Sequence, residues 1–372
     1  MQLRTTVSTL FLLALTALLA PGTALAGGYM FAVETGSTDT VTHPSGYDGS
    51  GGTLTVTVCI DPDSANASDM VIPTQNVIRT WNARVPTTDN VVSPAPDVPS
   101  TRFDYESMLL HEIGHCQGVS HPALGSESGL GSPDVDYTRS TDGGDGYDLD
   151  PGSDMLIATP DDVRGNDVNL NWFRIGINNP FLTSLPAFLD ASNFSQSLAH
   201  LPGADNYAAG GSDVVAGHFG FSDTEAVMHQ GQSVGEAQRT LTADDLGMIR
   251  YAESGLDESD GSGDDYDLVL SYAGLTAGCD IVIDSTSSGS IARCSLVGVF
   301  VGTDHHVRIT SAALTYNSVG PNWYFNQLSN EVIEPGPFVA SVPALRPFGF
   351  AAVGLMLAVA GSLALQNRHG SN

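Results

Sequence analysis

Residues 111 to 121 have the sequence His-Glu-Ile-Gly-His-Cys-Gln-Gly-Val-Ser-His, and this segment constrains the chain more than any other. On a helix, His111 and His115 are four residues apart, so both imidazoles project from the same face. Gly118 can adopt a left-handed conformation that ends a helix, and the following turn would bring His121 back as a third imidazole. Three nitrogen ligands leave one open position on a tetrahedral zinc ion, which is typical of a catalytic site.

The residues around these histidines predict the rest of the helix and its chemistry. Asp104 precedes the motif, and an acidic residue favours the N-terminal turn of a helix. Leu109 and Ile113 fall on another face, which we expect to pack into the core. Glu112 is next to His111 in the chain and is placed to accept a proton from a water molecule that zinc has acidified.

The pattern H-E-x-x-H-x-x-G-x-x-H resembles that of the metzincin zinc endopeptidases. This resemblance implies a turn with a methionine beneath the metal, and Met228 is the candidate, with a plain core methionine as the alternative. Thr242 and Asp245 then predict a capping box that begins a further helix. A methionine turn followed by such a helix resembles the matrixin branch, in a bacterial form, although residues 122–223 form a long insertion before the turn.

The resemblance implies an α+β zinc protease domain over residues 27–254 that hydrolyses protein or peptide substrates. One zinc ion would be held by the three histidines, with Glu112 as the general base. A surface binding or adhesion protein that keeps a structural zinc site is the main alternative, and a zinc hydrolase acting on a non-peptide bond is another.

The alternating residues Thr53 to Ile60 predict a strand, and the spacing within Val71 to Val85 predicts a helix. Little chain remains before residue 104, so we expect a small sheet.

The insertion is acidic, since residues 122–167 contain ten Asp, one Glu and two Arg. Carboxylates alternate there with turn-forming residues, and hard oxygen ligands on tight turns are what Ca²⁺ requires. A solvated acidic loop is the alternative to calcium binding. The candidate calcium ligands are Asp142, Asp145, Asp148, Asp150 and Asp154.

Both ends of the chain predict its location. Residues 1–26 combine Arg4, an apolar run and the small residues Ala24 and Ala26, a pattern typical of a secretory signal peptide. Residues 336–372 contain a Pro-rich segment and the apolar stretch 348–365, which is about 27 Å long as a helix and predicts a membrane-spanning anchor. This end resembles the C-terminal sorting segments of bacterial surface proteins, and a buried core helix is the alternative. We therefore expect an exported protein tethered at the cell surface.

Composition excludes two classes of protein. Hydrophobic residues make up 41% of the chain, which is too many for a generic disordered protein. The formal charge is −29 and the chain contains no lysine, so there is no basic stripe for a phosphate backbone and nucleic acid is not an expected partner.

The segment after the protease domain predicts a second module. Residues 255–265 are rich in Gly, Ser and Asp and indicate a linker, and residues 266–335 contain short alternating stretches that predict a small antiparallel β module.

An exported chain with four cysteines favours disulfides. Proximity in the sequence favours Cys279–Cys294 and leaves Cys59–Cys116, with a free thiol at Cys116 as the alternative. The pair His305-His306 could bind a metal, although a solvent-facing turn is the simpler interpretation.

Overall fold

The central sheet joins strands that lie far apart in the sequence. The computed structural model describes residues 28–32, 39–121, 149–150, 163–164 and 172–329, the last range with short gaps. Five strands follow one another in the sheet order β12-β3-β13-β15-β14, and β2 pairs with the start of β15. Their bounds are β2 Val41–His43, β3 Gly52–Ile60, β12 Tyr266–Leu275, β13 Ile281–Thr286, β14 Ala292–Phe300 and β15 His306–Asn317.

Most neighbouring strands of this sheet are parallel. β3 lies between β12 and β13 and is parallel to both, with Gly52 opposite Tyr266 and Val58 opposite Ile281. β13 is also parallel to β15, and only β14 runs antiparallel to its neighbour. The strand predicted at Thr53 to Ile60 is confirmed as β3, whose Val56, Val58 and Ile60 are buried. The described part of the chain is therefore a mixed α/β structure with a largely parallel sheet.

The prediction of a separate antiparallel module at residues 266–335 is wrong. The strands expected there exist, but β12 and β13 flank β3, so they complete the sheet that the first part of the chain begins. All described residues belong to one compact unit within residues 1–329. Alternating hydrophobicity shows which face of a strand is buried and does not show which strand lies beside it. This is why the sequence also predicted too small a sheet for the first domain.

Residues 255–265 are likewise not a free linker. The backbone N–H groups of Gly51 and Gly52 donate to the carbonyls of Gly263 and Asp265, which places this segment against the start of β3. Leu256 packs against the core. The Gly, Ser and Asp residues that suggested a linker instead form tight turns, in which Asp side chains accept hydrogen bonds from nearby backbone groups.

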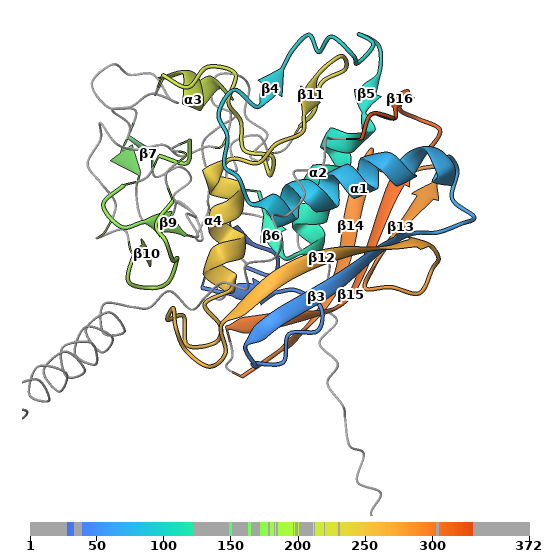
Figure 1. Ribbon diagram of the computed structural model, residues 1–372. Helices are drawn as coiled ribbons and strands as arrows, with labels where there is room; N and C mark the ends of the chain where they lie inside the picture. The colour runs from blue at the N-terminus through green and yellow to red at the C-terminus, as the bar shows by residue number, and fades with distance from the viewer. Residues whose placement is uncertain are drawn as a thin grey trace, which may run out of the picture. The chain divides into compact units, whose positions relative to one another are not determined.

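Two longer helices, α1 Ala67–Ala83 and α2 Tyr105–Cys116, lie together on one face of the sheet (Figure 1). Val77 and Trp81 of α1 and Leu109 and Ile113 of α2 are buried in the shared core, as the helical spacing predicted. α4 Ala243–Ala252 and the short α3 Asp213–His218 follow later in the chain. The remaining strands form two-residue pairs: β1 Gly28–Tyr29 with β6 Val119–Ser120, β4 Val91–Val92 with β11 Ala237–Gln238, β5 Phe103–Asp104 with β16 Trp323–Tyr324, β7 Leu149–Asp150 with β8 Val163–Arg164, and β9 Phe173–Arg174 with β10 Phe194–Ser195.

All four cysteines form disulfides, but the predicted pairing is wrong. The bonds are Cys59–Cys279 and Cys116–Cys294, and no cysteine is free. Cys59 near the end of β3 lies beside the segment that leads into β13, and Cys116 at the end of α2 lies over β14. Each disulfide therefore follows from the packing of the sheet and its helix, which proximity in the sequence could not predict.

Three of the predicted segments lie outside the described residues. These are the signal peptide at 1–26, most of the acidic insertion and the C-terminal segment 336–372 with its apolar stretch. Among the helices that the structure describes, none is long and apolar enough to cross a membrane.

Candidate metal centre

The structure brings the three predicted histidines together. Nε2 of His121 lies 3.1 Å from Nε2 of His115 and 3.3 Å from Nε2 of His111. The ligand atoms of all three residues lie within 4.8 Å of one another. The predicted gathering of these side chains is confirmed, and together they form a cluster that could bind a metal ion.

Two backbone carbonyls fix the orientation of the rings. Nδ1 of His111 lies 2.6 Å from the carbonyl oxygen of Val227, and Nδ1 of His115 lies 2.8 Å from that of Val119. A carbonyl can only accept, so each Nδ1 carries the proton and each Nε2 keeps a lone pair. Both Nε2 atoms belong to the cluster whose ligand atoms lie within 4.8 Å of one another, and a bound cation would satisfy their lone pairs.

The same two rings are neutral at physiological pH. Desolvation, with the neighbouring histidines, lowers the pKa of His111 to about 3 and the pKa of His115 well below its usual value. A histidine must be deprotonated to bind a metal. The two candidate ligands on α2 are therefore already in the protonation state that a metal requires.

Gly118 allows the chain to turn back after α2. Its φ is 106°, and its N–H donates to the carbonyl of His115 at 2.9 Å. A Cβ at this position would lie 2.8 Å from Cγ2 of Thr42, so both the conformation and the space require glycine. After the turn, β6 pairs with β1, and this pairing directs His121 towards the other two histidines.

Glu112 lies between the two histidines of α2 and is 7% exposed. Its Oε2 is buried and makes no hydrogen bond to any residue that the structure describes. Burial raises the pKa of its carboxyl to about 7, although the backbone N–H of Cys294 and the charge of Arg293 act in the opposite direction. A carboxylate with this pKa can exchange a proton near neutral pH.

Met228 is buried against α2, one residue after Val227, whose carbonyl holds His111. A Cβ added to Gly114 would lie 2.2 Å from Sδ of Met228 and 3.1 Å from Cζ2 of Trp81. The turn that contains Met228 therefore packs directly against the helical turn that separates His111 from His115. No pattern in the sequence indicates the carbonyls of Val227 and Val119, because backbone groups are the same at every residue.

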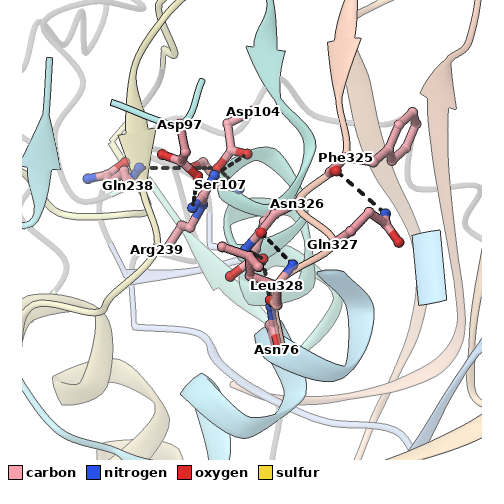
Figure 2. Close-up of polar contacts among 11 residues, drawn as sticks. Asn76, Asp97, Asp104, Ser107, Gln238, Arg239, Phe325, Asn326, Gln327 and Leu328 are labelled. Carbon is pink, nitrogen blue, oxygen red and sulfur yellow. Dashed lines mark hydrogen bonds and ion pairs between the residues drawn. The ribbon is translucent and has the colours of Figure 1, made fainter. Parts of the chain in front are cut away.

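The start of α2 is fixed by a buried carboxylate (Figure 2). Asp104 accepts hydrogen bonds from the backbone N–H and the hydroxyl of Ser107, so it is the N-terminal cap of α2. Arg239 donates to both carboxylate oxygens of Asp104, at 2.7 and 2.8 Å, and also to Asp97. This network connects α2 to the segment that precedes α4. Arg239 could not be identified from the sequence, because its partners lie more than 130 residues away.

The candidate calcium residues are not tested by the structure. Four of them, Asp142, Asp145, Asp148 and Asp154, lie outside the described residues. Only the backbone of Asp150 is described, where it pairs with Val163 in the two-residue strands β7 and β8.

Comparison with known proteins adds no assignment. No family model, no curated protein and no solved structure matches this chain. The interpretation of the metal centre rests on its own residues and their geometry.

Proposed function

We propose that this chain is a zinc-dependent endopeptidase of the metzincin kind. The observation that carries the proposal is the convergence of the Nε2 atoms of His111, His115 and His121, together with the buried carboxyl of Glu112 on the helix that carries the first two. Nitrogen ligands at about 2.0–2.1 Å in a tetrahedron around zinc are about 3.3 Å apart. The observed separations of 3.1 and 3.3 Å agree with this donor set.

When bound, zinc supplies a Lewis acid that polarises a substrate carbonyl and acidifies a water molecule. The chain's own residues would perform the proton transfer. Ionised Glu112 would take a proton from the attacking water and deliver it to the leaving nitrogen of the peptide. Its buried Oε2 is available for this because no described residue donates to it.

Strand β14 supports a peptide as the substrate. It is the last strand in the sheet order among the described residues, and an edge strand can pair with an extended peptide backbone. Cys294 of β14 is bonded to Cys116 of α2, and its N–H acts on the carboxyl of Glu112, so the strand passes beside the proposed base. Val297 and Phe300 of β14 are exposed and could contact apolar side chains of a substrate.

A protease assay with and without a zinc chelator tests the proposal. We expect the purified protein to cleave casein, and we expect the chelator to abolish cleavage. Glu112→Gln should retain zinc and lose cleavage, because the amide leaves the three ligands intact but cannot act as a base. A binding or adhesion protein with a structural zinc would instead retain its zinc and show no cleavage in the wild type.

We further propose that the protein is exported and tethered at the cell surface by residues 348–365. Two disulfides support an oxidising environment, since such bonds are rare in the cytosol.

Ca²⁺ binding by the insertion remains part of the proposal. A rise in melting temperature in CaCl₂, compared with NaCl of equal ionic strength, tests it.

A further inference from the structure

A second group of metal-binding side chains lies away from the first. Glu258 is in the turn that follows α4, and His305 and His306 are at the beginning of β15. Oε1 of Glu258 lies 3.1 Å from Nε2 of His305 and 3.4 Å from Nε2 of His306. Their ligand atoms lie within 4.8 Å of one another.

One buried nitrogen of this group lies at ion-pair distance from the carboxylate of Glu258. His306 is fully buried, so the solvent-facing turn suggested by the sequence is wrong for this residue. Its Nε2 lies 3.4 Å from Oε1 of Glu258, and this ion-pair contact does not have the geometry of a hydrogen bond to any described residue. A buried polar atom without a well-formed hydrogen bond is destabilising unless another group, such as a bound ion, satisfies it. The atom faces a carboxylate oxygen, which points to a cation.

Neighbouring side chains hold the group in position. Nδ1 of His306 lies 2.8 Å from Nε2 of His43, which is also fully buried, and Nδ1 of His43 lies 3.2 Å from the hydroxyl of Tyr266. If His306 donates its Nδ1 proton to His43, its Nε2 carries a lone pair, which is the form that binds a metal. The hydroxyl of Tyr251 donates to Oε2 of Glu258, so Oε1 remains directed at the two histidines.

We propose that Glu258, His305 and His306 form a second divalent-metal site. Two imidazoles and one carboxylate are a donor set that zinc and other first-row transition metals accept. The side chain of His305 is 31% exposed, which leaves a route by which an ion can enter. The ion would connect the turn after α4 with the start of β15, two segments about 47 residues apart in the chain.

Zinc content of the full chain, measured after dialysis, tests this site separately from the first. We expect two zinc ions per wild-type chain and one in His305→Ala or Glu258→Gln. His121→Ala should also retain one, and His121→Ala combined with His305→Ala should retain none. His200→Ala, at an exposed histidine outside both groups, should retain two.

Added ZnCl₂ provides a second measurement. In the His121→Ala background it should raise the melting temperature, and His305→Ala should abolish that rise. Circular dichroism identifies any variant that fails to fold, and His305→Ala is the preferred variant because its side chain is partly exposed.

Two results would overturn the second site. One is a wild-type chain with a single zinc that His121→Ala removes, because the group would then be only an ion pair. The other is an unchanged zinc content in both His305→Ala and Glu258→Gln. Loss of zinc in His305→Ala but not in His121→Ala would support the second site and contradict the proposed catalytic centre.

Discussion

Asp245, in the first turn of α4, accepts a hydrogen bond from the backbone N–H of Met228 at 3.0 Å. The same carboxylate accepts from the N–H of Val227 at 3.0 Å and from the N–H of Thr242 at 2.7 Å. Because the carbonyl of Val227 orients His111, one buried carboxylate joins the cap of α4 to a proposed zinc ligand. The capping box that the sequence predicted therefore also supports the candidate metal centre.

Asp245→Ala should destabilise the protein and weaken the metal centre. It removes a helix cap and leaves buried backbone N–H groups of the methionine turn without an acceptor. We expect the free energy of unfolding in urea to fall by about 2–4 kcal/mol. Zinc retention should fall as well, because His111 loses its fixed orientation. Asp267→Ala, on the exposed side of β12, is the matched control and should change stability by less than about 0.5 kcal/mol.

Gly114→Ala tests the contact between α2 and Met228. Alanine normally stabilises a helix relative to glycine, but here its Cβ would lie 2.2 Å from Sδ of Met228. We expect the free energy of unfolding to fall by about 1–3 kcal/mol because the core is already packed. In a Met228→Ala background the same substitution should be much less harmful.

A matched control exists in α4. A Cβ at Gly247 would meet only ring atoms of Phe194, at 3.6 and 3.7 Å, which is ordinary contact. Gly247→Ala should therefore be neutral or stabilise by up to about 1 kcal/mol. Equal effects of Gly114→Ala in the wild-type and Met228→Ala backgrounds would contradict the predicted contact.

Peptide mapping without reduction should recover Cys59 linked to Cys279 and Cys116 linked to Cys294. Replacing Cys116 and Cys294 together by alanine should lower the free energy of unfolding by about 3–5 kcal/mol, since this bond closes a long loop. Zinc retention should also weaken, because Cys116 directly follows the proposed ligand His115. A peptide linking Cys279 to Cys294 would show that the sheet is assembled differently.

Local patterns in the sequence predicted the parts of this protein that depend on neighbours along the chain. The i, i+4 spacing of His111 and His115 required only a helix, and Gly118 allowed the turn that follows it. Thr242 and Asp245 predicted the start of α4 in the same way. Each of these features is complete within about ten residues, so its physical basis was visible in the sequence.

Long-range pairing was not visible. The sequence predicted strands near β12 and β13 but could not show that they flank β3, about 200 residues earlier, because a parallel partner leaves no signal in either strand. The disulfide prediction failed for the same reason. Likewise, His305 and His306 were noticed as a pair, but their proposed partner Glu258 is distant in the chain and came close only through the fold.

Ionisation of Glu106 should lower the free energy of unfolding as pH rises. It is buried in α2, where Oε2 accepts hydrogen bonds from Asn76 at 2.9 Å and Asn326 at 2.8 Å. Burial raises the pKa of its carboxyl above the ordinary value of 4.5, although these hydrogen bonds act in the opposite direction. The folded state therefore binds the proton more tightly than the unfolded state does.

The sign of the pH effect follows from this difference. Below pH 4.5 Glu106 is protonated in both states, and its contribution to stability is fully present. As pH rises through the ordinary carboxyl pKa towards the higher folded pKa, that contribution is lost. Glu106→Gln keeps an acceptor for Asn76 and Asn326 and cannot ionise. Urea unfolding between pH 4 and pH 8 should show the variant gaining stability relative to the wild type as pH rises, whereas a constant difference would mean that Glu106 ionises without a burial penalty.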